Sequence, residues 1–226
     1  MAPRWTATSL LPFTSMSRSQ RERMLSGESY DSRDPELLAL AHRARALLAD
    51  FAALPSTDAA ARHRTLAELL GHVGAGVWIE SPFFCDYGQQ ITIGDDSFIN
   101  VNCVFLDAAP IQLGANILVG PGVQLLTISH PISAAERIVP IDARQPEQAP
   151  YRTHARPIVV GDRVWLGAGS IVLPGVTIGA NAVIGAASLV TGDIPPDCLA
   201  HGQPCRVQRS LGHDDGATTK LTPPAV

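Results

Sequence analysis

Large apolar residues recur at every sixth position in two stretches of the chain, residues 91–128 and 158–193. When these stretches are written in blocks of six, the third position of every block is large and apolar, and glycine often follows it. This period is typical of a parallel β-helix, in which three blocks make one triangular turn and the third positions point inward. The twelve inward positions are Ile93, Ile99, Phe105, Leu113, Val119, Leu125, Val160, Leu166, Val172, Ile178, Ile184 and Val190.

Twelve blocks give four turns, and residues 77–90 are expected to add an imperfect turn before them. Glycine and asparagine are expected at the corners, where the backbone needs a positive φ or a tight bend. Because each turn covers its neighbour, only the two ends of such a helix expose unpaired strand edges. The pattern therefore predicts a mainly β fold over residues 77–193.

Residues 19–76 follow a different pattern, which predicts helices. Ser19 precedes a short helical segment, and Asp34 with Pro35 provides a capping residue followed by proline at the first helical position. Apolar residues at helical spacing follow, and a third helix is expected within residues 56–76. The arginines of this segment are expected to form a solvated face; they are Arg43, Arg45, Arg62 and Arg64.

The remaining segments break both patterns. Residues 129–157 are polar and contain five prolines, so this excursion from the repeat is expected to be functional or disordered. Residues 194–211 are expected to close the β-helix with a strand and a short helix. Residues 1–18 are expected to be a flexible extension and residues 212–226 a disordered tail.

Composition then narrows the function. The chain has 226 residues, of which 46% are hydrophobic, and its net charge of −4 differs from the basic excess of nucleic-acid-binding proteins. No apolar run approaches the ~18 residues of a membrane span. Four cysteines without a CxxC pair indicate reduced thiols and a cytoplasmic protein. The single lysine, Lys220, lies in the polar tail, which argues against P-loop and Schiff-base chemistry.

Several segments resemble the maltose and galactoside O-acetyltransferases, which are hexapeptide-repeat acyltransferases, and FFCDYG makes the maltose type the closer one. The resemblance covers roughly residues 19–211 and includes RERMLSGESY of the helical segment. It implies a left-handed parallel β-helix, acetyl transfer from acetyl-CoA to a sugar hydroxyl, no metal, and a homotrimer whose clefts are shared by two chains. The other matching segments are FFCDYG, SFINVNCVFLDAAPIQLG, SHP, VWLGAGSIVLPGVTIG, LVTGDIPP and GQPCRV.

His130 is the candidate catalytic residue. Acetyl transfer to a hydroxyl needs a base, imidazole has a suitable pKa range, and His130 opens the excursion, where an active site is accessible. In the family the histidine of this motif is the general acid and base. Cys85 and Cys103 are expected to pack in the core rather than to act as nucleophiles.

The resemblance also implies contacts with the two substrates. Asn100 matches an asparagine near the acetyl group, and Asp86 and Asp107 match acceptor ligands, although Asn and Asp also suit turn geometry alone. Trp165 matches a residue beside the pantetheine arm, or one that packs in the trimer. The other matches to coenzyme A contacts are Ala168, whose amide is expected near the thioester oxygen, Ala186 and Thr191 on pantetheine, and Arg206 and Arg209 on the phosphates.

Three alternatives stay open at the level of sequence. A γ-type carbonic anhydrase needs three zinc-bound histidines, with one pair typically five residues apart, but the β-helical part offers only His130, His154 and His201. A non-catalytic repeat protein is a second alternative, against which the matching site residues argue. The third is an enzyme of the same family that acetylates a hydroxylated metabolite other than a sugar.

Overall fold

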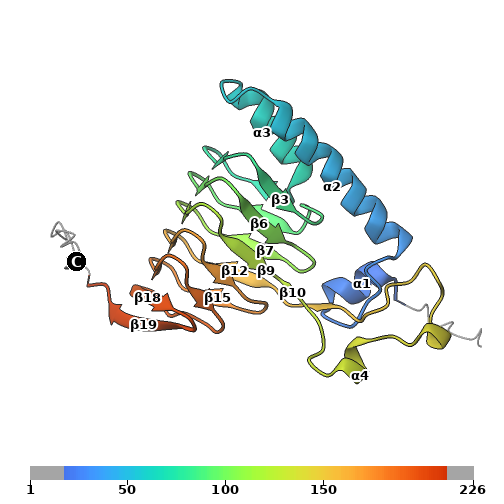
Figure 1. Ribbon diagram of the computed structural model, residues 1–226. Coiled ribbons are helices and arrows are strands. Elements are labelled where there is room, and N and C mark those ends of the chain that lie inside the picture. Colours follow the sequence, from blue (N-terminus) through green and yellow to red (C-terminus); the bar gives the residue numbers. More distant parts are fainter. Residues whose placement is uncertain (1–17, 213–226) are drawn as a thin grey trace, which may run out of the picture.

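The computed structural model describes residues 18–212, and it consists of a β-helix with helices at its first turn and a hairpin at its last (Figure 1). The expected extension and tail lie almost wholly outside these residues. Three helices precede the β-helix: α1 (Gln20–Leu25), α2 (Pro35–Ala53) and α3 (Ala59–Leu69). None of the helices among the described residues is long and apolar enough to cross a membrane.

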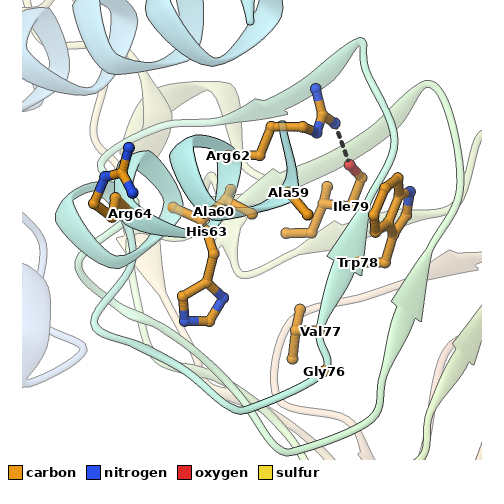
Figure 2. A pocket seen from close by; sticks show the side chains of 10 residues that line it. Ala59, Ala60, Arg62, His63, Arg64, Gly76, Val77, Trp78 and Ile79 are labelled. Atoms are coloured by element: carbon orange, nitrogen blue, oxygen red, sulfur yellow. Dashed lines mark hydrogen bonds between the residues drawn. The ribbon is translucent and has the colours of Figure 1, made fainter. Parts of the chain in front are cut away.

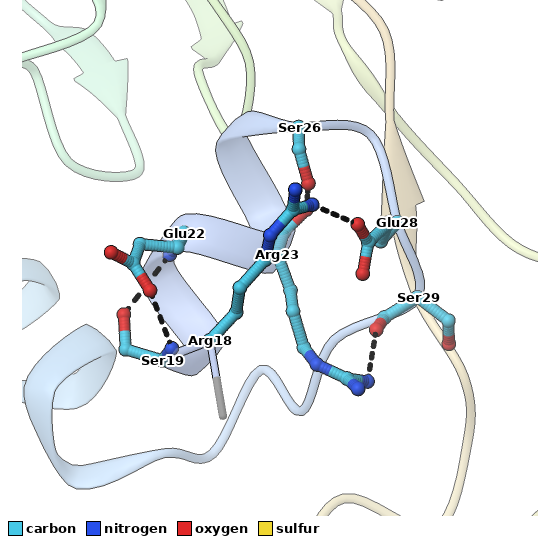
Figure 3. Close-up of polar contacts among 7 residues, drawn as sticks. All are labelled: Arg18, Ser19, Glu22, Arg23, Ser26, Glu28 and Ser29. Carbon is cyan, nitrogen blue, oxygen red and sulfur yellow. Dashed lines mark hydrogen bonds and ion pairs between the residues drawn. The ribbon is translucent and has the colours of Figure 1, made fainter. Parts of the chain in front are cut away.

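Local sequence signals start these helices where expected. Ser19 and Glu22 form a capping box at the start of α1, and Arg23 donates to the carbonyl of Ser29 after it (Figure 3). The Asp34 side chain accepts a hydrogen bond from the amide of Glu36, and Pro35 is the first residue of α2. The sequence therefore predicted both starts correctly.

The strands of the β-helix form three parallel sheets. The first sheet contains β1, β4, β7, β12 and β15; the second contains β2, β5, β8, β13, β16 and β18, with β19 antiparallel at its edge; the third contains β3, β6, β9, β14 and β17. This gives five complete turns, so the four regular turns and the additional first turn are confirmed. The bounds are β1 (His72–Val73), β2 (Trp78–Ile79), β3 (Phe83–Cys85), β4 (Ile91–Ile93), β5 (Phe98–Ile99), β6 (Cys103–Leu106), β7 (Ile111–Leu113), β8 (Leu118–Val119), β9 (Gln124–Leu126), β12 (Ile158–Val160), β13 (Trp165–Leu166), β14 (Ile171–Val172), β15 (Thr177–Ile178), β16 (Val183–Ile184), β17 (Leu189–Val190), β18 (Cys198–Gly202) and β19 (Cys205–Ser210).

The inward positions form the core of the β-helix. All twelve predicted third positions are buried, and the most exposed of them, Leu113, shows only 4% of its surface. The glycines that follow them have a different role from the one expected. A Cβ on Gly94 would lie 2.6 Å from the backbone of Gly114 in the next turn. Close approach of successive turns therefore requires glycine there, while positive φ values fall on other corner residues such as Asn102 and Asn116.

Two boundaries differ from those expected. α3 ends at Leu69, and β1 already pairs with β4, so the β-helix begins at His72 rather than at residue 77. At the other end, β18 and β19 form an antiparallel hairpin, and the short helix expected in residues 194–211 does not form. Pairing with the neighbouring turn thus overrides the local pattern at both ends.

The excursion between β9 and β12 has a defined path. It leaves through β10 (Ile128–Ser129), contains α4 (Ala134–Arg137) and η1 (Ile141–Ala143), and returns through β11 (His154–Ala155), which is antiparallel to β10. It lies beside the α1 region (Figure 1), where the amide of Tyr30 donates to the carbonyl of Thr153 at 3.1 Å.

The arginines of the helical segment do not form a single solvated face. Arg62 is buried, donates to the carbonyl of Ile79 at 2.8 Å and stacks on the ring of Phe51 at 4.3 Å. Arg45 reaches from α2 to the backbone of Asp86. Both side chains join the helices to the first turn of the β-helix, which a helical pattern alone does not reveal.

Candidate active site

His130 lies just after β10, where the chain leaves the β-helix, and its side chain is exposed. Its Nδ1 lies 2.8 Å from the carbonyl oxygen of Arg152. Because a carbonyl can only accept, Nδ1 carries the proton in the neutral ring and Nε2 keeps a lone pair. The ring also packs edge-on against Tyr151, with centroids 5.3 Å apart and planes at 79°. In this tautomer Nε2 is therefore the ring nitrogen that can accept a proton.

Asn100 and the two predicted alanines lie along one edge of the β-helix, between the second and third sheets. Asn100 directly follows β5, and its amide donates to Val119 in the next turn, just as Gly167 donates to Ile184. Ala168 and Ala186 follow the equivalent glycines of two successive turns. Both alanines are exposed, and the amide of Ala168 donates to no acceptor within residues 18–212. This N–H is therefore available to a bound carbonyl oxygen.

Asp86 follows β3, at the edge between the third and first sheets, and remains 23% exposed at its side chain. Arg45 donates to its backbone carbonyl at 2.7 Å, and the guanidinium lies 3.6 Å from the carboxylate. Burial raises the pKa of Asp86, and the charge of Arg45 opposes this rise. The structure thus leaves Asp86 accessible beside a fixed positive charge.

Asp107 was expected to be an acceptor ligand, and in the described chain its carboxylate binds backbone amides of the neighbouring turn. The residue is fully buried, and its Oδ1 accepts hydrogen bonds from the amides of Asp86 at 3.0 Å and Tyr87 at 2.8 Å. Its Oδ2 accepts from the amide of Gln90 at 3.3 Å. Three backbone amides thus donate to this carboxylate, which shapes the turn that carries Asp86.

The cofactor candidates Trp165, Arg206 and Arg209 share the outer face of the second sheet. Trp165 pairs with Val183 and Val183 with Leu199, which lies opposite Arg209. Arg206 lies opposite His201, and His201 is on the same side of β18 as Leu199. Arg206 and Arg209 are three residues apart, yet they face the same side because a register shift adds one residue to β19. A bulged strand, rather than the expected helical turn or compact loop, therefore brings both arginines to one face.

Thr191 lies at a different edge from the two alanines. It follows β17 and lines a small cavity of about 170 Å³ together with Arg206. Two of the predicted cofactor residues therefore meet there, near the last turn of the β-helix.

One protomer does not bring all predicted residues together. Asn100 and Ala168 lie between the second and third sheets, whereas His130 leaves the third sheet at its other edge. Among the described residues, no hydrogen bond joins His130 to Asn100. The candidate site of a single chain is thus divided between two edges of the β-helix.

A cavity of about 510 Å³ contains none of the predicted site residues. It lies between α3 and β2 and is lined by Arg62, His63 and Trp78 among others (Figure 2). The predicted site residues lie elsewhere, at the exposed edges of the β-helix and on its closing hairpin.

Three contributors to the site were missed by sequence reasoning: Tyr151, the carbonyl of Arg152, and Arg45. Tyr151 and Arg152 lie more than twenty residues after His130 in an irregular segment. A backbone carbonyl leaves no signal in a sequence, and Arg45 is 41 residues from Asp86. The two cysteines near the site behave as expected, since both are buried and burial raises the pKa of the Cys85 and Cys103 thiols.

Comparison with known proteins agrees with this geometry. The maltose acetyltransferase hexapeptide capping motif matches residues 23–74. The hexapeptide repeat of succinyl-transferase matches residues 90–126, and the bacterial transferase hexapeptide matches residues 157–192. Galactoside O-acetyltransferase of Escherichia coli K12 is 32% identical to this chain, over 88% of this chain and 93% of the relative's length. The chain belongs to the maltose and galactoside O-acetyltransferase family.

Two similar proteins with solved structures are acetyltransferases. A maltose O-acetyltransferase from Clostridium difficile 630, known from its crystal structure, has 37% sequence identity to this chain and a TM-score of 0.78. The match covers 86% of this chain and 98% of that one. A hexapeptide-repeat acetyltransferase of Vibrio cholerae, solved with acetyl-CoA, is 39% identical with a TM-score of 0.74 over 86% of this chain and all of that one. As a member of this family, the protein is an acetyl-CoA-dependent acetyltransferase, and the carbonic anhydrase alternative is not favoured.

Proposed function

We propose that the protein transfers the acetyl group of acetyl-CoA to a hydroxyl of a maltose-like or glucose-like sugar, with His130 as the general base. The observation that carries this proposal is the hydrogen bond between Nδ1 and the carbonyl of Arg152, which leaves Nε2 as the basic nitrogen. The sugar itself is suggested by relatives named for maltose and galactoside acetylation.

The residues suit a direct transfer. Nε2 of His130 takes the proton of the acceptor hydroxyl while its oxygen attacks the thioester carbon. The Ala168 amide is suited to stabilising the negative oxygen, because this donor is already oriented before charge develops. When the carbon–sulfur bond breaks, Nε2 returns the proton to the thiolate, so acetylated sugar and free coenzyme A leave. No covalent intermediate on the enzyme is needed.

In our proposal, coenzyme A lies at a subunit junction, between the outer face of the second sheet and the neighbouring copy. The Ala168 amide lies at the thioester end, Ala186 contacts pantetheine, and Trp165 borders the pantetheine arm. Arg206 and Arg209 share the Trp165 face about three strand spacings further on, roughly 15 Å at ~4.8 Å per strand. Guanidinium groups at this distance suit the phosphates of the nucleotide end.

The proposal includes a homotrimer. The second sheet presents a continuous row of apolar side chains to its outer face, whereas the first sheet presents mainly polar ones such as Gln112. A second copy against this row buries it, and brings a His130 edge to a neighbour's Asn100 edge. The row consists of Trp78, Phe98, Leu118, Trp165, Val183 and Leu199.

The decisive experiment is an acetyl-CoA turnover screen with a panel of sugars and hydroxylated metabolites, with free thiol as the readout. Turnover with maltose or glucose supports the proposal, whereas turnover confined to a compound that is not a sugar replaces the acceptor. The His130→Ala variant should fold normally and lose about 10²–10⁴-fold of the turnover. His63→Ala, a similarly exposed histidine on α3, is the matched control. Retained turnover in His130→Ala would exclude the assigned base.

A further inference from the structure

Tyr151 makes the only ring contact of His130 within the described chain. The tyrosine is 37% exposed, and its ring meets the imidazole edge-on with centroids 5.3 Å apart. The next residue, Arg152, supplies the carbonyl that accepts from Nδ1. Two consecutive residues of the returning excursion therefore touch the candidate base through two different kinds of contact.

The segment that carries these two residues is itself fixed on both sides. The amide of Arg152 donates to the carbonyl of Arg137 in α4 at 2.7 Å, and the carbonyl of Thr153 accepts from the amide of Tyr30. β10 and β11 pair immediately beside it, with Ser129 opposite His154. The position of the Tyr151 backbone is thus set by contacts with α4, with Tyr30 and with β10, none of which involves the side chain of His130.

One hydrogen bond at Nδ1 does not by itself fix an imidazole, because the ring can still rotate about that contact and carry Nε2 away. An aromatic edge against the ring restricts this rotation. We propose that Tyr151 is a positioning residue, whose ring holds the plane of His130 so that Nε2 faces the acceptor hydroxyl. This inference rests on the proposed role of His130.

The inference predicts a defect in turnover rather than in binding. An edge-to-face pair is worth about 0.5–1.5 kcal/mol, which corresponds to a loss of roughly 2–13-fold in kcat. Tyr151→Leu should show this loss with unchanged KM values for acetyl-CoA and for the acceptor. Tyr151→Phe keeps the ring and should restore wild-type kcat. Ile141→Ala, at an 82% exposed position of the same excursion, is the matched control and should not change kcat.

A double-mutant cycle separates this inference from the proposed function. Tyr151→Leu should have no further effect in the His130→Ala background, because Tyr151 acts only through the imidazole. If His130→Ala keeps its turnover, the proposed function fails. If His130→Ala is inactive and Tyr151→Leu equals wild type, only the present inference fails. A raised acceptor KM, or an additive loss in the double variant, also overturns it, because Tyr151 then contacts the substrate directly.

The cycle requires folded variants, which thermal unfolding and the subunit mass establish. Should Tyr151→Leu fail to fold, Tyr151→Met tests the same loss of an aromatic edge with a more adaptable side chain. A wild-type kcat in the methionine variant contradicts the inference as clearly as it does in the leucine variant.

Discussion

At the scale of single residues, Asp107 acts as a buried centre for the turn beside the site. Three backbone amides from residues 86–90 donate to its carboxylate. Burial raises the pKa of this group from 3.8 to about 6, although the amides of Tyr87 and Gln90 lower it. At neutral pH the carboxylate is therefore mostly ionised although burial disfavours the charge, and the hydrogen bonds from the amides stabilise it.

This raised pKa predicts a measurable pH dependence of stability. Because the folded protein binds the proton more tightly than the unfolded chain, the contribution of Asp107 is fully present below pH 3.8 and is lost as pH rises through 6. The free energy of unfolding of the wild type, minus that of Asp107→Asn, should therefore rise by about 1–1.5 kcal/mol when the pH falls from 7.5 to 5. Urea unfolding at both pH values measures it, and a difference that is constant with pH contradicts the raised pKa.

The site residues show which roles a sequence can reveal. His130 could be proposed as the base from the sequence, because its chemical type and its place at the start of the excursion are both visible along the chain. Asp107 was assigned to the acceptor because the sequence gives its chemical type but not the direction of its side chain, which here points at backbone amides. The roles of Arg45 and Arg152 depend on contacts over long separations, so no local pattern could indicate them.

At the scale of elements, the repeat made the β-helix predictable because one inward residue per block must be buried whatever its neighbours do. The boundaries were less predictable, since β1 forms by pairing with β4 rather than by its own sequence. The hairpin of β18 and β19 likewise depends on β16, beside which β18 lies. The same dependence explains why a short helix was expected in place of β19.

The glycines between turns give a prediction at this scale. A Cβ at Gly94 would lie 2.6 Å from the backbone of the next turn, so Gly94→Ala should destabilise the protein by about 1–3 kcal/mol. Gly192 has nothing within 4 Å of its would-be Cβ, so Gly192→Ala should stay within about 0.5 kcal/mol of wild type. Urea midpoints of the two variants test this, and equal midpoints would show that the turns can separate without strain.

At the scale of the whole molecule, the outer face of the second sheet predicts how copies associate. Leu118 is 52% exposed in the middle of the apolar row, so Leu118→Asp places a charge within the proposed interface. Light scattering should give three times the 23.9 kDa chain mass for wild type and a smaller mass for this variant. Gln112→Asp, on the first sheet of the same turn, is the control and should remain trimeric. A wild-type mass of about 24 kDa refutes the homotrimer.

The same outer face extends to the two arginines of the closing hairpin, and this gives the last prediction. Arg206 and Arg209 share the face of Trp165. In our proposal they are assigned to the nucleotide end of coenzyme A rather than to the thioester. Replacing both with Gln should raise the KM for acetyl-CoA roughly 10–100-fold, since hydrogen bonds to charged groups are worth about 1.5–3 kcal/mol. The kcat at saturation should change little, because remote contacts act equally on ground state and transition state. Arg33→Gln, outside this face, is the control. An unchanged acetyl-CoA KM at low salt would make these arginines surface charges only, and a KM change confined to the sugar would place them in the acceptor site instead.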